Sequence, residues 1–342
     1  MMRYRTLGRT GLRVSEIGFG CGNVGGLMTR DGHDEQLGAV RRALALGINY
    51  FDTARAYGEG RSETNLGRVL DEVGEEVVLS TKVRLEADAL GDTAAAAVSH
   101  AEQGLARLGR DSVDLMQLHT RLVNRRESGR FGMTPAEVLG PGGVVEGFKR
   151  LRDQGRVKFF GFTGLGDVEA IEALVDSGEL DSFQAYYNLL NPSAAQAVPD
   201  GFSALDYRRV IDRAAAKGMG VVVIRVLAAG VLSPTPESGG GTSREPLSAG
   251  SDYEQDVARA HKLGFLKDHG LESLPQAAIR FALMKPEVAT VLVGFSNNAQ
   301  IDEAAACSGA GPLPETANAA LRELWDSDFG SRQPGSPLSP RP

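Results

Sequence analysis

The sequence is short of cysteine and of long apolar runs. Only Cys21 and Cys307 occur among its 342 residues, too few for a disulfide framework or, unaided, for a structural zinc site. No uninterrupted apolar stretch approaches the roughly 20 residues that a membrane span needs, and the N-terminus carries no apolar leader. We therefore expect a protein of a reducing compartment, cytoplasmic and without a membrane partner.

Basic clusters and aromatic residues are also scarce. No run of Lys and Arg is longer than a pair, and the net charge is −7, which disfavours a nucleic-acid partner. The 42% hydrophobic and 24% charged residues are typical of a globular chain that can bury a sizeable core. No feature predicts a particular oligomeric state, and none predicts a metal site.

Short apolar runs alternate with longer amphipathic stretches, which is the pattern of parallel strands joined by helices. The expected strands are 14–19, 48–52, 77–82, 113–119, 159–162, 182–184, 220–224 and 290–294. The expected helices include 34–46, 61–73, 92–108, 143–153, 168–176, 206–217 and 253–268. Eight such units predict an α/β fold, a closed (β/α)8 TIM barrel.

The barrel is expected to form one domain over residues 1–330, followed by a disordered tail over 331–342 that is rich in Pro, Ser and Gly. Two long loops, 121–142 and 232–251, follow the fourth and seventh strands. In a barrel both would lie over the active face, as lids or substrate-selecting walls or else as surface insertions.

An open doubly wound sheet is the competing fold. The segment GCGNVG at 20–25 matches the dinucleotide-binding pattern G-x-G-x-x-G after a strand. That motif should open a helix at once, whereas 26–33 is polar and turn-like, and the acidic residue expected about 20 positions onward is missing. The closed barrel is therefore favoured.

Three consecutive predicted strands end in polar groups: Asp52, Lys82 and His119. Tyr57 follows Asp52 on a short loop. Functional groups of these barrels gather at the C-terminal ends of the strands, so the four side chains are expected to converge on one mouth. We refer to them below as the tetrad.

The tetrad predicts a proton-donating cluster. A phenol with an ordinary pKa near 10 is a poor acid at neutral pH, and a neighbouring Lys82 ammonium would stabilise the tyrosinate of Tyr57. Asp52 would orient Lys82, and His119 would hydrogen-bond the substrate oxygen or relay a proton. Taken singly, Asp52 and Lys82 could be a structural ion pair and His119 a core histidine. The four together favour catalysis.

The motifs around these residues resemble those of the aldo-keto reductases, from Tyr4 to about Trp325. DTARAYG at 52–58 is similar to the family's D-T-A-x-x-Y-G, Lys82 to its strand-three lysine, and DLMQLH at 114–119 to its D-x-x-x-x-H. Residues 7–15 resemble its N-terminal hairpin. The resemblance implies hydride transfer between NAD(P)(H) and an aldehyde, a ketone or a sugar, with Tyr57 as general acid.

The resemblance also implies a cofactor that lies extended across the barrel mouth. Its carboxamide would contact the segments after strands five and six, its pyrophosphate the segment that starts at Arg225, and its adenosine the segment that starts at Gly294. The cofactor-binding residues implied are Gly22, Asn23, Asp52, Thr163, Gly164, Gln184, Arg225, Val226, Leu227, Gly294, Phe295, Ser296, Asn297, Gln300 and Glu303.

Three departures from the family pattern concern the cofactor. Many relatives have Ser-Asn where this chain has Thr163-Gly164, and an aromatic residue often occupies the region of 224–225. No Lys or Arg accompanies Ser296 and Asn297 to meet a 2′-phosphate. NADP(H) is favoured as the family habit, and NAD(H) stays open.

Two other functions fit the same residues. Some barrels of this family act as channel subunits that sense the redox state of the cofactor, and such a regulatory subunit would need little turnover. A cofactor-independent lyase or isomerase could instead use Lys82 as a Schiff-base nucleophile.

Overall fold

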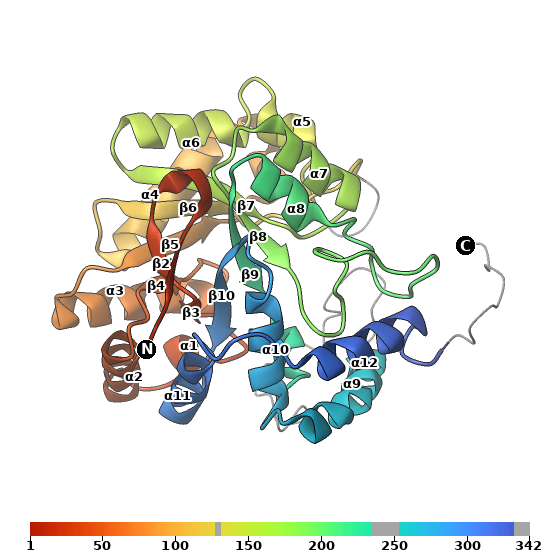
Figure 1. Cartoon of the computed structure of the whole chain (residues 1–342). Coiled ribbons are helices and arrows are strands. Elements are labelled where there is room, and N and C mark those ends of the chain that lie inside the picture. The colour runs from red at the N-terminus through yellow and green to blue at the C-terminus, as the bar shows by residue number, and fades with distance from the viewer. Residues whose placement is uncertain (127–130, 234–252, 332–342) are drawn as a thin grey trace.

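A computed structural model describes residues 1–126, 131–233 and 253–331 (Figure 1). Most of the predicted loop 232–251 and all of the predicted tail except Ser331 lie outside the described residues. None of the helices in the described ranges is both long enough and apolar enough to cross a bilayer.

Eight parallel strands close into a barrel, which confirms the predicted (β/α)8 fold. The strands are β3 (Ile17–Gly20), β4 (Tyr50–Asp52), β5 (Val78–Val83), β6 (Val113–Leu118), β7 (Val157–Thr163), β8 (Ser182–Tyr186), β9 (Gly220–Ile224) and β10 (Val288–Gly294). Closure comes from β10, which pairs with β9 on one side and β3 on the other. All eight strands therefore point their C-terminal ends to the same mouth.

Helices surround the strands (Figure 1). They are α1 (Leu27–Arg30), α2 (His33–Ala45), α3 (Arg61–Val73), α4 (Thr93–Leu108), α5 (Pro135–Leu139), α6 (Val144–Asp153), α7 (Val168–Ser177), α8 (Val210–Ala216), α9 (Tyr253–His261), α10 (Leu274–Leu283), α11 (Asn298–Ala306) and α12 (Glu315–Asp326). In α3, Leu66, Val69 and Leu70 are buried while Arg68 is exposed, the one-sided pattern of a helix packed on a sheet. Gly74 ends this helix in the left-handed conformation.

An antiparallel hairpin of β1 (Tyr4–Thr6) and β2 (Arg13–Ser15) precedes the barrel, as predicted. Leu7 and Val14 are fully buried in a cluster with barrel residues, so the hairpin closes the N-terminal end of the barrel. Gly8 has φ +49°, and a Cβ there would meet the Gly220 nitrogen at 2.3 Å, so only glycine fits. The predicted strand 14–19 is in fact two strands, one in the hairpin and one in the barrel.

Three further predictions about local structure were wrong. The turn-like segment 26–33 contains the short helix α1, and the predicted loop 121–142 contains α5. In α5 the Thr134 hydroxyl and the Glu137 carboxylate form a capping box with proline at the first turn. The helix expected from residue 206 begins at Val210.

Candidate active site

The structure brings the four tetrad residues together at the barrel mouth. Asp52 is the last residue of β4, Lys82 lies near the end of β5, and His119 directly follows β6. Tyr57 stands just before the short 3-10 turn Gly58–Gly60. Because β4, β5 and β6 are adjacent and parallel, their ends place these side chains side by side.

Lys82 contacts two other members of the tetrad, Asp52 and Tyr57. Its Nζ forms an ion pair with the Asp52 carboxylate, donates to the Thr53 carbonyl at 2.9 Å and lies 3.1 Å from the Tyr57 hydroxyl. The side chains of Lys82 and Asp52 are only 1% and 3% exposed. Burial lowers the pKa of Lys82, but the charges and hydrogen bonds of Asp52 and Tyr57 outweigh it, and the net pKa is raised. The ammonium therefore stays charged next to the phenol.

Asp52 is held by more than the lysine. Its second oxygen accepts hydrogen bonds from Ser80 Oγ at 2.9 Å and Gln184 Nε2 at 2.7 Å. Thr163 Oγ1 in turn donates to Gln184 Oε1 at 3.0 Å. The amide and hydroxyl that sequence reasoning assigned to a cofactor carboxamide thus also fix the carboxylate that orients Lys82.

The rings of His119 and Tyr57 meet in a T-shaped arrangement. The ring centroids are 5.7 Å apart with an interplanar angle of 81°. The His119 Nδ1 is buried without a hydrogen-bond partner among the described residues. Burial, reinforced by the positive charges of Lys82, Arg84 and Arg225, holds the pKa of His119 well below 6.5. The imidazole is therefore neutral near pH 7 and offers one N–H donor.

Tyr57 lies on a loop that neighbouring residues hold in place. Tyr57 is half-buried, and the Gly58 nitrogen donates to Asn23 Oδ1 at 2.9 Å. A Cβ on Gly22 would lie 3.7 Å from the Tyr57 ring, so the backbone of this glycine lies close beside the phenol. Gly22 and Asn23, predicted as cofactor residues, lie against the loop that carries the phenol.

The ends of β7 and β9 carry the next group of predicted cofactor residues. The Gly164 nitrogen donates to the Gln184 carbonyl at 2.9 Å, which ties the segment after β7 to β8. Arg225 has φ +56°, and its carbonyl accepts from Asn188 Nδ2 at 3.0 Å. A non-glycine residue held in this conformation is costly and is typical of functional sites.

The side chains after β9 differ in exposure. Arg225 is exposed, and within residues 1–126, 131–233 and 253–331 its guanidinium makes no ion pair. Val226 is buried and Leu227 half-buried. Arg225 is therefore the one charged group that this segment presents to solvent at the mouth.

The segment after β10 leads into α11. Gly294, Ser296 and Asn297 are exposed, whereas Phe295 is buried and packs on Phe19 with ring centroids 5.1 Å apart. The Ser296 nitrogen donates to Gln300 Oε1 at 2.8 Å. The side-chain oxygen of Asn297 caps α11, so polar backbone and side chains cluster at an exposed helix start.

Glu303 is oriented toward a neighbouring helix. Its carboxylate accepts a hydrogen bond from the hydroxyl of Ser273, the N-cap residue of α10. One of its oxygens thus accepts a hydrogen bond while the side chain stays half-buried, and contact between Glu303 and an adenosine stays a prediction.

Sequence reasoning missed Ser80 and Asn188. A signal existed for Ser80, which stands two residues before Lys82, and alternate residues of a strand share a face. No such signal existed for Asn188, because its role depends on the fold of the segment after β9. Its side chain reaches the Arg225 carbonyl across 37 positions of sequence.

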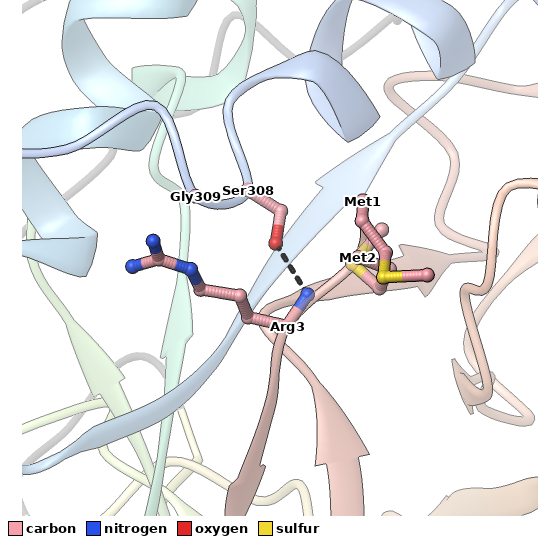
Figure 2. Close-up of a pocket in the computed structure, with 5 residues that line it drawn as sticks. All are labelled: Met1, Met2, Arg3, Ser308 and Gly309. Atoms are coloured by element: carbon pink, nitrogen blue, oxygen red, sulfur yellow. Dashed lines mark hydrogen bonds between the residues drawn. The ribbon is translucent and has the colours of Figure 1, made fainter.

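A separate pocket lies away from the tetrad. Figure 2 shows Met1, Met2, Arg3, Ser308 and Gly309 lining it, with the Arg3 nitrogen 2.9 Å from Ser308 Oγ. These residues belong to the segment just before the hairpin and to the turn after α11. The pocket holds no tetrad side chain. Across the described part of the chain, no cluster of three or more His, Cys, Asp or Glu is suited to a metal.

Comparisons with known proteins agree on one family. The model of the Aldo/keto reductase family matches residues 16–326. The L-galactose dehydrogenase of Arabidopsis thaliana is 26% identical over 309 residues, which cover 88% of this chain and 86% of that protein. A protein of Schizosaccharomyces pombe named as a voltage-gated potassium channel subunit beta is 26% identical over 322 residues, 88% of this chain and 86% of its own.

Solved structures support the fold. An aldo-keto reductase from Bacillus halodurans, in its holo form, superposes with a TM-score of 0.70 at 23% identity. The match covers 98% of this chain and 99% of that one. At this identity the likeness supports the barrel architecture.

Proposed function

Since the chain belongs to the aldo/keto reductase family, we propose that it transfers hydride between NAD(P)(H) and an aldehyde or ketone, or the corresponding alcohol or sugar, with Tyr57 as general acid. The observation that carries this proposal is the 3.1 Å approach of Lys82 Nζ to the Tyr57 hydroxyl, with the lysine in an ion pair with Asp52.

The chemistry of the phenol follows from that contact. Tyr57 donates its proton to the carbonyl oxygen as negative charge develops there, and the Lys82 ammonium stabilises the tyrosinate that remains. Asp52 keeps the lysine protonated and oriented. In the oxidative direction the same pair accepts the proton from the alcohol.

His119 contributes as a neutral donor. Because its pKa is held well below 6.5 by burial and by neighbouring positive charges, it adds no further charge to the mouth at neutral pH. Its ring and the Tyr57 ring form a T-shaped pair, so the two side chains lie next to each other at the mouth. We propose that its N–H supports the same carbonyl oxygen that Tyr57 protonates.

The residues at the mouth fit a nicotinamide dinucleotide. Arg225 presents an exposed guanidinium with no charged partner among the described residues, and the exposed start of α11 presents Ser296 and Asn297. Positive charge and a helix N-terminus both suit phosphate. Gly22 places no side chain beside the Tyr57 ring. A bound nicotinamide would supply hydride to the carbonyl carbon.

The remaining predicted cofactor residues support the same placement. Thr163 and Gly164 lie at the end of β7, and Gln184 lies within β8 and donates to Asp52, so the three are beside the tetrad, where the carboxamide would lie. We propose NADP(H) as the cofactor, with NAD(H) as the other outcome of the test below. We also propose that the protein works in the cytoplasm as a single domain over residues 1–330, without nucleic-acid or membrane partners.

A regulatory role is the second candidate. It is favoured by the similarity to the protein named as a potassium channel subunit beta, which covers most of both chains. In that role the barrel would bind the nucleotide and turn over little or no carbonyl.

One pair of assays separates these functions. Quenching of the Trp325 and tyrosine fluorescence gives the Kd of NADPH and of NADH, and the absorbance of the reduced cofactor follows turnover of butanal, benzaldehyde and free sugars. We expect tight binding of NADPH together with turnover of at least one carbonyl. Tight binding with no turnover supports the regulatory role, and no binding of either nucleotide refutes the proposal.

A further inference from the structure

Three tetrad members stand at or next to strand ends, whereas Tyr57 stands on a loop. Side chains on strands are placed more precisely than side chains on loops, because the sheet holds the backbone beneath them. The Tyr57 hydroxyl nevertheless lies 3.1 Å from Lys82 Nζ, the contact on which the proposed function rests. The position of the phenol therefore depends on whatever holds this loop.

The turn that follows Tyr57 has an unusual backbone. Gly58, Glu59 and Gly60 all have positive φ, at +59°, +58° and +90°. Glycine adopts this left-handed region readily, but Glu59 carries a Cβ and is strained there. A strained conformation of this kind persists only where the surrounding contacts fix it, and it is typical of functional sites.

Asn23 contacts this turn from another part of the barrel. Its Oδ1 accepts a hydrogen bond from the Gly58 nitrogen at 2.9 Å. The backbone of Tyr57 and Gly58 also bonds to residues of the same loop and of the start of α3, namely Ala54, Arg61 and Ser62. Asn23 follows β3 instead, so its contact ties the Tyr57 loop to the segment after a second strand.

The segment that carries Asn23 is itself held on two sides. Arg30 of α1 donates from Nη1 to the Asn23 carbonyl at 2.9 Å and from Nη2 to the Gly25 carbonyl at 3.1 Å. The Gly25 carbonyl also accepts from Ser296 Oγ at 2.6 Å. A Cβ on Gly25 would meet the Phe295 nitrogen at 2.3 Å, so the segment packs directly on the residues after β10. Asn23 therefore stands on a backbone that α1 and the end of β10 both fix.

We propose that Asn23 is a positioning residue of this site: its side-chain oxygen fixes the turn after Tyr57 and so keeps the phenol within reach of Lys82 and of the carbonyl oxygen. This inference rests on the proposed function and adds to it a residue that acts through Tyr57. A displacement of about 1 Å at a reacting group can lower a rate by on the order of 10²-fold, so the loss of one hydrogen bond on this loop has a measurable effect.

The first test replaces the hydrogen-bond acceptor. The Asn23 side chain is exposed, so Asn23→Ala removes the contact without opening the core. With NADPH and the best carbonyl of the panel above, both saturating, we expect kcat to fall by about tenfold while the Kd of NADPH stays at its wild-type value. Asn23→Asp keeps an oxygen in the same place and should hold kcat within about threefold of wild type.

The matched control is Asn49→Ala. Asn49 Oδ1 also accepts from a backbone nitrogen, that of Ser15, at 2.7 Å, but this contact lies at the closed end of the barrel. The same substitution there removes the same kind of hydrogen bond far from the mouth. We expect it to leave both kcat and the Kd of NADPH unchanged.

A double variant shows whether Asn23 acts through the phenol. Tyr57→Phe lacks the proton donor, so the exact position of its ring should matter little to kcat. We expect Asn23→Ala to change kcat by less than about twofold in the Tyr57→Phe background, whereas independent effects would multiply. Hydrogen exchange of the Gly58 amide needs no turnover, and it should be faster in Asn23→Ala and unchanged in Asn49→Ala.

Four results overturn the inference and leave the reductase proposal standing. They are a wild-type kcat in Asn23→Ala, the same fold loss of kcat in the Tyr57→Phe background, an Asn23→Asp variant as slow as Asn23→Ala, and unchanged exchange of the Gly58 amide. A raised Kd of NADPH with kcat unchanged also overturns it, because Asn23 would then act on the cofactor. If the wild-type protein binds NADPH and turns over none of the carbonyls, the proposed function fails and the inference falls with it.

Discussion

The buried pair of Asp52 and Lys82 can be tested by a double-mutant cycle. In Lys82→Met the Asp52 carboxylate stays buried without its counter-charge, although Ser80 Oγ and Gln184 Nε2 still donate to it at 2.9 and 2.7 Å. Removing one partner of a buried ion pair lowers the free energy of unfolding by about 3–5 kcal/mol. Because two hydrogen bonds to Asp52 survive, we expect a loss of about 3 kcal/mol for Lys82→Met.

The converse variant differs in its pH dependence. In Asp52→Asn the lysine loses the carboxylate that offsets its burial, so its pKa should fall below the unfolded value. The unfolded chain then binds more protons than the folded one between those two pKa values. The free energy of unfolding of Asp52→Asn should therefore rise with pH across that window.

The double variant gives the interaction energy between Asp52 and Lys82. Asp52→Asn combined with Lys82→Met leaves no unpaired charge, so it should be more stable than the sum of the two single losses by about 2 kcal/mol. Urea denaturation followed by far-UV circular dichroism measures all four proteins at one pH. If the losses add within about 0.5 kcal/mol, the two groups do not interact in the folded protein and the account of the pair is wrong.

Three further outcomes follow from other parts of the structure. Gly8→Ala should lower the free energy of unfolding by roughly 3 kcal/mol in urea titration and leave kcat unchanged, because the new Cβ would meet the Gly220 nitrogen at 2.3 Å far from the mouth. His119 should keep the NMR shifts of a neutral ring as the pH falls below 6.5. Since the unfolded chain binds that proton below pH 6.5 and the folded chain does not, the residue should make the protein less stable as the pH falls through that range. Glu63→Ala should cost about 3 kcal/mol in the same titration, because the fully buried carboxylate accepts from Arg107 Nε at 2.6 Å, and a loss under 1 kcal/mol would show that the pair does not hold α3 to α4.

Much of the barrel could be predicted from the sequence because its strands are buried on both faces. Runs such as 220–224 are continuously apolar, and the predicted bounds of this strand match β9. The predicted strand 14–19 was wrong because an apolar pattern does not show where the chain passes from the hairpin to the barrel. Glu16 lies between β2 and β3, and its carboxylate is held inside the fold by Arg5 and Ser308.

Short helices were harder to predict than strands. α1 has four residues and α5 has five, too few to show a helical repeat. α5 nevertheless carried a local signal, since Thr134, Pro135 and Glu137 together spell a capping box with proline at the first turn. α1 carried none, as it begins after a left-handed Gly26 and lacks a side-chain cap.

The tetrad was predictable because three of its members lie at or next to strand ends and Tyr57 follows Asp52 on a short loop. Its supporting contacts were less so, because they depend on pairs that only the closed barrel brings together. Gln184 meets Asp52 across 132 positions of sequence, a contact that no local pattern encodes. The contact between Ser273 and Glu303 shows the same limit, since it joins residues 30 positions apart in sequence.

The central claim concerns the phenol, and Tyr57→Phe tests it most directly. The change removes one hydroxyl from a half-buried ring and leaves the ion pair of Lys82 and Asp52 in place. We predict that kcat for the best carbonyl substrate falls by about 10²–10⁴ while the Kd of the nucleotide stays at its wild-type value. Turnover within a fewfold of wild type, at an unchanged nucleotide Kd, would contradict the assignment of Tyr57 as the proton donor.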